Sequence, residues 1–246
     1  MKRVKNKKII ICDIDGTLAY SDTEISNKML ELIKNLQNKY IFITIGGGNY
    51  IHLYNQFIKK YQEKIDKEIY VYVSSGLECY KVTKESTEKI YSIELTNEEK
   101  YKIVRVVSNF IKENNIIPDT YDQIEDRGAM VAFSILGRKA DKLLKQNYDP
   151  KKTKRKKFIK NYFFKKLPGF EMKIGGTTTI DFTKKGFTKL FGIKKIKEMF
   201  RCNFRDMVYF GDDLQEGGND SAIKSAIDCI KVKNPEDTYN KLKKYL

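Results

Sequence analysis

A short apolar segment that ends on two carboxylates is the feature that most restricts the fold. Residues 9–18 are I-I-I-C-D-I-D-G-T-L, so an apolar run leads directly into Asp13 and Asp15. Short continuous apolar runs are typical of strands buried on both faces of a parallel sheet. Ligands bind at the carboxyl ends of such strands, and two carboxylates placed there repel each other unless a cation lies between them. The segment therefore predicts a cation-binding edge of a parallel sheet.

The rest of the chain alternates strands with helices at its two ends, which predicts an α/β fold with a Rossmann-like parallel sheet. We expect strands at 8–12, 40–45, 70–74, 207–210 and 228–232, and helices at 26–38, 50–61, 185–200 and from 235.

Residues 85–183 have a different pattern, with β-like segments at 90–93, 130–134, 170–174 and 178–182 and helices at 97–114, 139–146 and 154–166. This predicts an α+β domain inserted into the core. The expected domains are therefore core residues 1–84, an inserted domain at 85–183 and core residues 184–246.

Composition limits the classes of partner. The 246 residues carry a formal net charge of +16, and lysines are spread along the whole chain. The densest basic run, 151–166, has apolar residues at helical spacing, so an amphipathic helix with a solvated basic face is favoured over a nucleic-acid site. No apolar run is long enough to span a bilayer, and no secretory signal is evident, so we expect no membrane partner and a cytoplasmic location. The scattered cysteines are expected to be reduced thiols.

A second acidic cluster follows another apolar strand. Asp212, Asp213 and Asp220 lie in G-D-D-L-Q-E-G-G-N-D, residues 211–220, and should reach the same sheet edge as Asp13. Hard oxygen ligands in this number suit Mg²⁺, which binds through a few carboxylates together with substrate phosphate. A carboxylate beside the metal can also act as a nucleophile toward phosphorus.

Together, D-I-D-G-T-L at 13–18 and the 211–220 segment resemble the haloacid dehalogenase (HAD) superfamily, whose members transfer phosphoryl groups through an aspartyl-phosphate. The position of the insertion resembles the members with a large α/β cap, called type IIB.

Further segments resemble the eukaryotic-type phosphomannomutases and their prokaryotic relatives. These segments are I-G-G-G-N at 45–49, I-E-D-R-G-A-M at 124–130, S-I-L-G-R at 134–138, I-G-G-T-T-T-I-D-F at 174–182 and G-F-T-K-L at 186–190.

The resemblance implies a role for each matching core residue. Asp13 would be the phosphorylated nucleophile, Asp15 the general acid and base, and Lys189 the residue that holds the transferring phosphoryl group. Asp13, the backbone carbonyl of Asp15 and Asp212 would bind the metal, with Asp220 beside them in the metal site. Since Asp15 must exchange a proton with a sugar oxygen, we expect burial to raise its pKa.

Substrate-binding residues are expected from three further segments. Gly46 and Gly47 would let backbone amides approach phosphate at a helix start. Arg127 and Arg138 would clamp the distal phosphate of a sugar phosphate. Thr179 and Asp181, on one face of a strand, would bind sugar hydroxyls. His52, the single histidine, is expected to be structural or exposed.

Departures from the family leave the reaction open. Asp22 stands where an arginine is expected, Lys145 or a neighbour replaces another arginine, and lysine lacks the planar fork of arginine. A mutase that interconverts mannose 1-phosphate and mannose 6-phosphate, with a hexose bisphosphate activator and a homodimer formed through the inserted domain, is the first hypothesis. A sugar-phosphate phosphatase is the second, and a non-enzymatic anion or RNA binder is the third.

Overall fold

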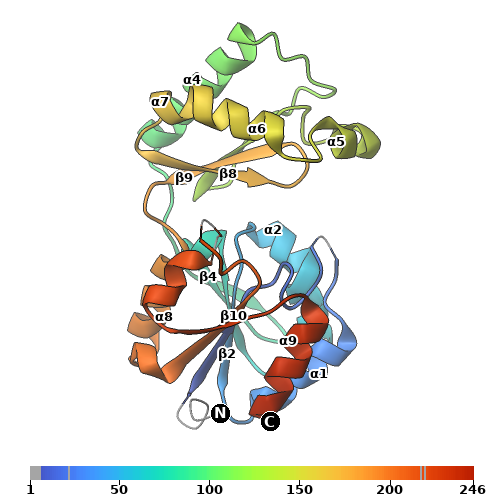
Figure 1. Cartoon of the computed structure of the whole chain (residues 1–246), viewed down its shortest axis with the longest axis vertical. Coiled ribbons are helices and arrows are strands. Elements are labelled where there is room, and N and C mark those ends of the chain that lie inside the picture. Colours follow the sequence, from blue (N-terminus) through green and yellow to red (C-terminus); the bar gives the residue numbers. More distant parts are fainter. Residues whose placement is uncertain (1–6, 22, 217, 219) are drawn as a thin grey trace. The chain divides into compact units, whose positions relative to one another are not determined.

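The computed structural model describes residues 7–21, 23–216, 218 and 220–246. Asp22 and Asn219 lie outside the described residues, so the expectation attached to Asp22 has no structural counterpart. The chain divides into two compact units (Figure 1). We call Met1–Ser92 with Phe187–Leu246 the core unit, and Ile93–Gly186 the inserted unit.

The core unit is built on a seven-stranded sheet in the order β11-β10-β1-β2-β3-β4-β5. Neighbours from β11 to β3 pair in parallel, whereas β4 and β5 are antiparallel. The strand bounds are β1 (Ile9–Cys12), β2 (Ile41–Ile45), β3 (Ile69–Val73), β4 (Glu78–Val82), β5 (Thr87–Ser92), β10 (Met207–Gly211) and β11 (Asp228–Lys231). The predicted parallel α/β core is confirmed.

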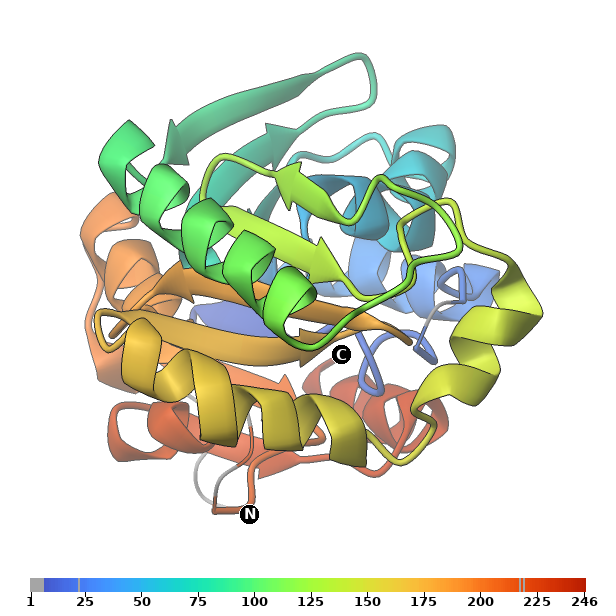
Figure 2. The same cartoon turned by 90° about the horizontal axis from the view of Figure 1, so that it is seen from above.

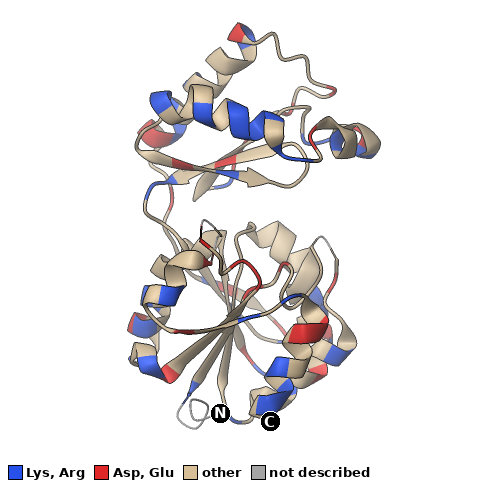
Figure 3. Ribbon diagram, in the orientation of Figure 1, with Lys and Arg blue, Asp and Glu red and all other residues tan. Residues whose placement is uncertain are grey.

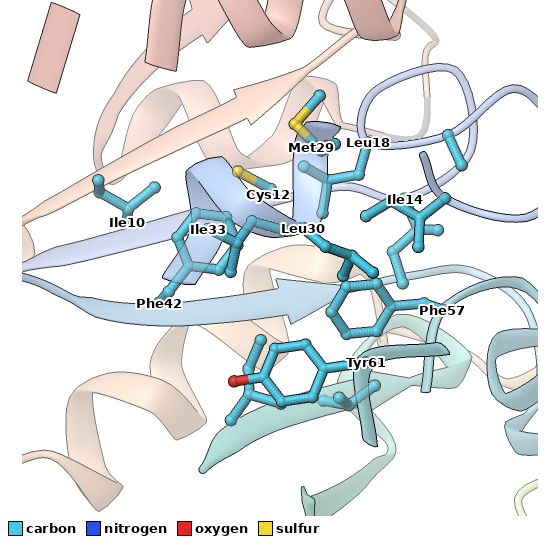
Figure 4. Packing of buried hydrophobic residues seen from close by; sticks show 14 of the residues in the cluster. Ile10, Cys12, Ile14, Leu18, Met29, Leu30, Ile33, Phe42, Phe57 and Tyr61 are labelled. Atoms are coloured by element: carbon cyan, nitrogen blue, oxygen red, sulfur yellow. The ribbon is translucent and has the colours of Figure 1, made fainter. Parts of the chain in front are cut away.

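Strand β1 is buried on both faces, as its uninterrupted apolar sequence predicts. Alternate side chains point to opposite faces of a strand. Ile10 and Cys12 accordingly pack in the cluster that contains α1 (Asn27–Leu36), as Figure 4 shows. Ile9 and Ile11 pack in a second cluster with α8 (Lys189–Met199). The two helices thus cover opposite faces and hold β1 at the centre of the sheet.

The remaining elements of the core unit complete these layers. One continuous helical stretch is formed by α2 (Tyr50–Leu53), the π-helical η1 (Tyr54–Ile58) and α3 (Lys59–Lys64). The last α-helix is α9 (Pro235–Leu242), and four short 3₁₀ helices are η2 (Ser74–Gly76), η4 (Phe204–Asp206), η5 (Ser221–Ser225) and η6 (Lys243–Tyr245).

The inserted unit is a four-stranded antiparallel sheet with helices on one face. Its strand order is β6-β7-β9-β8, with β6 (Ile124–Asp126), β7 (Met130–Ser134), β8 (Phe170–Gly175) and β9 (Thr179–Lys184). Figure 2 shows α4 and the α6–α7 stretch over the same sheet. The helices are α4 (Asn97–Glu113), α5 (Lys142–Tyr148), α6 (Thr153–Phe158), the π-helical η3 (Ile159–Phe163) and α7 (Phe164–Lys166).

Alternation along the strands fixes which face of this second sheet the helices cover. Phe133 of β7 and Phe182 of β9 are fully buried in one cluster with Phe110 of α4 and Phe163 of η3. Thr179 and Asp181 of β9 therefore lie on the opposite face of the sheet.

Two features differ from the sequence-based expectations. Residues 87–92, expected in the insertion, form β5, which pairs with β4 in the core sheet. The basic run 151–166 does pack its apolar side on the sheet, but Arg155 is not part of a solvated face. Its side chain is 1% exposed, pairs with Asp149 at 3.0 Å and donates to the carbonyls of Gly175 and Gly176.

None of the helices that the structure describes is long and apolar enough to cross a membrane.

A close contact between two glycines provides a test of this packing. Gly76 has a φ of +94°, and a Cβ built there would lie 2.4 Å from the backbone Cα of Gly192 in α8. Gly76→Ala should therefore lower the free energy of unfolding by about 2 kcal/mol or more, because it adds left-handed strain to a backbone clash. Gly169→Ala is the matched control, since a Cβ there meets nothing within 4 Å. Thermal unfolding of both variants checks this, and equal melting temperatures would contradict it.

Candidate active site

The carboxyl ends of β1 and β10 bring two predicted aspartates together. Asp13 directly follows β1 and Asp212 directly follows β10, and these strands are paired neighbours. The Asp13 amide continues the ladder by donating to the carbonyl of Phe210 at 2.9 Å. Figure 3 shows acidic segments at this end of the sheet. Parallel pairing thus joins two motifs that are about 200 residues apart in the chain.

Lys189 links this pair to the third aspartate. It is the first residue of α8 and is 1% exposed. Its Nζ lies 2.8 Å from Asp13 Oδ2 and 2.7 Å from Asp220 Oδ1. Burial alone would lower the pKa of Lys189, but the two carboxylates outweigh this and raise it. Lys189 is therefore a fixed positive charge inside the site.

Asp13 is strongly influenced by its surroundings. Burial raises its pKa to about 7, although Lys189 acts in the opposite direction, and the nearby Asp220 raises it further. Burial also raises the pKa of Asp212. These shifts have a common cause: carboxylates crowded in a poorly hydrated site gain from an additional cation.

The donor set fits Mg²⁺. Oxygens of Asp13, Asp212 and Asp220 lie within 4.8 Å of one another. Three carboxyl groups and one lysine ammonium leave the cluster short of positive charge, which a divalent cation would supply. Asp220 Oδ2 is buried and has no hydrogen-bond partner among the described residues. Glycines leave the space: a Cβ at Gly16 would lie 2.6 Å from Asp212 Oδ2, and one at Gly211 would lie 2.2 Å from Asp220 Oδ2.

Asp15 lies outside this carboxylate cluster and contacts the helical stretch after β2. Its Oδ1 accepts a hydrogen bond from Gln56 Nε2 at 2.8 Å, and its Oδ2 lies 3.3 Å from His52 Nε2. Burial acts to raise the pKa of Asp15, but the hydrogen bonds from His52 and Gln56 outweigh it, so the pKa is lowered. The expectation of a raised pKa is thus wrong for this structure, because burial is incomplete and both oxygens have donors.

The glycine-rich segment has a different role from the one expected for Gly46. The Gly46 amide donates to the carbonyl of Tyr72 at 2.9 Å, so it is not available to a phosphate in this structure. Gly47 is exposed. A Cβ at Gly48 would lie 2.6 Å from the ring of His52, so the third glycine makes room for that imidazole.

The inserted unit carries a row of charged residues on its open sheet face. Glu125 of β6 is opposite Ala132 of β7, and Ala132 is opposite Asp181 of β9, which is opposite Lys173 of β8. Residues opposite one another in a sheet point to the same face. Figure 3 shows these mixed charges along the strands.

Both predicted arginines are bound to Glu125 of this row. Arg127 Nε lies 2.5 Å from Glu125 Oε2, and Arg138 NH2 lies 3.0 Å from Glu125 Oε1. Arg127 also lies 3.6 Å from Asp181 Oδ1. Lys145 of α5 donates to the carbonyl of Arg138 at 3.0 Å, so a further cation lies beside the two arginines.

Sequence reasoning assigned no role in these clusters to Gln56, Glu125 and Tyr209, and it expected His52 to be structural or exposed. His52 and Gln56 are four residues apart, as two residues on one helical face would be, and this spacing was the available signal. Tyr209 lies inside an apolar strand, where an aromatic residue resembles ordinary core.

The pKa of Asp181 provides a test of the open face. Burial raises it from 3.8 to about 6, although Arg127 acts to lower it. Because the pKa is raised in the folded state, protonated Asp181 contributes its full stabilisation to the fold below about pH 4. That contribution is lost as the pH rises through 6. Asparagine does not ionise, so the Asp181→Asn variant does not lose stability in this way. The difference in free energy of unfolding, variant minus unmodified protein, should therefore increase between pH 4 and pH 7 by up to about 3 kcal/mol.

The matched control is Asp126→Asn. Burial acts to raise the pKa of Asp126, but hydrogen bonds from Lys100 and Gly128 outweigh it and lower the pKa. Ionised Asp126 therefore stabilises the folded state at neutral pH, and this stabilisation is lost on acidification. The stability of Asp126→Asn relative to the unmodified protein should change with pH in the opposite direction. Melting temperatures measured across the pH range check both signs, and a pH-independent difference for Asp181→Asn would contradict the analysis.

Comparisons with known proteins agree with this geometry. Residues 29–246 match the family model described as eukaryotic phosphomannomutase. The phosphomannomutase of Encephalitozoon cuniculi is 30% identical, over 96% of this chain and 92% of the relative. That of Schizosaccharomyces pombe is 26% identical, over 97% of this chain and 94% of the relative.

A solved structure shows the same fold at lower identity. The haloacid dehalogenase-like hydrolase from Bacteroides thetaiotaomicron has a TM-score of 0.61 and 17% identity, covering 98% of this chain and all of the other. The match to the family model over most of the chain and the 30% identity to a curated relative decide the family. This chain belongs to the eukaryotic phosphomannomutase family.

Proposed function

We propose that this protein is a phosphohexose mutase that interconverts mannose 1-phosphate and mannose 6-phosphate through a phosphorylated Asp13. The observation that carries the proposal is the cluster of Asp13, Lys189, Asp212 and Asp220 at one sheet edge, in a chain of the phosphomannomutase family. A mutase must phosphorylate one end of the sugar and later remove the phosphate from the other end.

The core residues would perform the phosphoryl transfer. An oxygen of Asp13 attacks phosphorus, the bond between phosphorus and the sugar oxygen breaks, and the sugar oxygen takes from Asp15 the proton that Asp15 accepted in the preceding transfer. In the reverse transfer, a sugar hydroxyl oxygen attacks the phosphorus of phosphorylated Asp13, the bond between phosphorus and the Asp13 oxygen breaks, and Asp15 accepts the hydroxyl proton. Lys189, already 2.8 Å from Asp13 Oδ2, would hold the phosphoryl oxygens by its charge.

Magnesium is the metal that we propose for the carboxylate cluster, with Asp13, Asp212, Asp220 and the backbone carbonyl of Asp15 as its protein ligands. Bound there, Mg²⁺ would neutralise the negative charge of the incoming phosphate. The pKa of about 7 at Asp13 supports this, because a carboxylate that is costly to ionise alone is stabilised as an anion by a nearby cation.

The inserted unit would bind the phosphate that is not being transferred. Arg127 and Arg138 share Glu125, so both guanidinium groups are held on one side of the sheet before substrate arrives. Thr179 and Asp181 lie on the same open face and would bind sugar hydroxyls. The two ends of the sugar must exchange places during the reaction. Arginines that bind a phosphate by its charge would accept the sugar in either orientation. We also propose a hexose 1,6-bisphosphate as activator, which phosphorylates Asp13, and a homodimer as the family resemblance implies.

The test is a time course with mannose 1-phosphate, Mg²⁺ and a catalytic amount of a hexose 1,6-bisphosphate. Mannose 6-phosphate and free phosphate are followed in the same reaction. Formation of mannose 6-phosphate with little free phosphate is expected. Free phosphate alone would overturn the mutase assignment in favour of a sugar-phosphate phosphatase. Asp13→Asn should abolish either reaction, because the amide cannot form the acyl phosphate, and retained turnover would refute the assigned nucleophile.

The role of the arginines is tested separately. Arg127→Ala should raise the KM for the hexose phosphate about 10- to 100-fold with a smaller change in kcat, since it removes a charge-assisted bond that is made in the ground state as well. Arg105, exposed on α4 of the same unit, is the matched control, and Arg105→Ala should leave KM unchanged. Steady-state kinetics on folded variants checks this, and an unchanged KM for Arg127→Ala would rule out the clamp.

A further inference from the structure

Tyr209 is a buried hydroxyl group in the site that the proposed reaction does not use. It lies in β10 and is fully buried. Its hydroxyl group accepts a hydrogen bond from Lys189 Nζ at 3.3 Å and donates one to Asp220 Oδ1 at 2.7 Å. A buried tyrosine hydroxyl group generally has a hydrogen-bond partner, but here both partners belong to the carboxylate cluster, so the hydroxyl group is part of the site.

The two oxygens of Asp220 are treated differently by their surroundings. Oδ1 accepts from both Lys189 and Tyr209, each at 2.7 Å. Oδ2 is buried and has no hydrogen-bond partner among the described residues. Since a buried carboxylate oxygen without a partner is costly, Oδ2 is the atom of Asp220 that is available to a cation.

The residues around Asp220 leave open space beside one of its oxygens only. Gly211, the last residue of β10, leaves the space beside Oδ2 open, because a Cβ there would lie 2.2 Å from that oxygen. Tyr209 holds Oδ1 from the same strand, two residues earlier. One strand therefore both anchors one oxygen of Asp220 and leaves room at the other.

We infer that Tyr209 is a positioning residue for the metal site: its hydroxyl group keeps Asp220 turned so that Oδ2 faces the cation. The inference rests on the proposed magnesium site and adds to it a residue that does not touch the metal. Without the hydroxyl group, Oδ1 would retain only Lys189, and the carboxylate could rotate to offer both oxygens to the ammonium. Residues that orient metal ligands in this way commonly change metal affinity by 10- to 100-fold.

The experiment compares Tyr209→Phe with Tyr72→Phe. Both tyrosines are fully buried in the same hydrophobic cluster, and each variant loses one hydroxyl group. The Tyr72 hydroxyl group donates to the sulfur of Met199 at 3.5 Å, and among the described residues it has no hydrogen-bond partner in the carboxylate cluster. Magnesium is titrated into each protein without substrate, and the dissociation constant is obtained from calorimetry or from the rise in melting temperature with Mg²⁺ concentration.

We expect Tyr209→Phe to weaken Mg²⁺ binding about tenfold and Tyr72→Phe to change it less than twofold. An unchanged constant for Tyr209→Phe, or an equal loss in both variants, would overturn the inference. Failure of the unmodified protein to bind Mg²⁺ would instead remove the proposed cofactor on which the inference rests, so the two failures are distinguishable. Melting temperatures without metal establish that each variant is folded.

Discussion

The site depends on one ammonium group buried between two carboxylates. Lys189 contacts Asp13 and Asp220 at hydrogen-bond distance, and all three residues are almost inaccessible to solvent. Removing charges from water is expensive, and only close opposite charges with further hydrogen bonds offset that cost. The arrangement therefore requires accurate placement of three elements: β1, the start of α8 and the segment after β10. Their side chains must be positioned to within about 0.5 Å. The packing of apolar residues on both faces of β1 provides the rigid frame for that accuracy.

The two units contribute opposite kinds of charge. The core unit presents carboxylates whose negative charge favours a bound cation, and Lys189 alone leaves them incompletely neutralised. The inserted unit presents arginines already paired with Glu125, on a sheet face that its helices do not cover. For the proposed sugar-phosphate substrate, the core carboxylates would act on phosphate through a metal, and the arginines would offer positive charge to an anionic group.

The sequence predicted those parts of the molecule that depend on local pattern. The parallel strands, the helix that begins near residue 26 and the strand at Met130–Ser134 all follow from the spacing of apolar residues. Strand β4 was missed because E-C-Y-K-V is too short and mixed to distinguish from a loop, and only its antiparallel pairing with β3 decides its state. Asp13, Lys189, Asp212 and Asp220 were found because they belong to motifs. Glu125, Arg155 and Tyr209 were not, because their partners are tertiary neighbours and their types are common on surfaces or in cores.

The split core has a consequence for synthesis of the chain. In the sheet, β10 is the neighbour of β1 on the side away from β2, and Ile9 pairs with Met207. The ribosome makes β10 about 200 residues after β1, so the emerging chain holds β1 with one edge unpaired until then. An apolar edge strand is a template for pairing with other chains. The inserted unit, whose internal contacts all fall within Ile93–Gly186, can fold during this interval. The last quarter of the chain thus both completes the carboxylate cluster and pairs the free edge of the first strand.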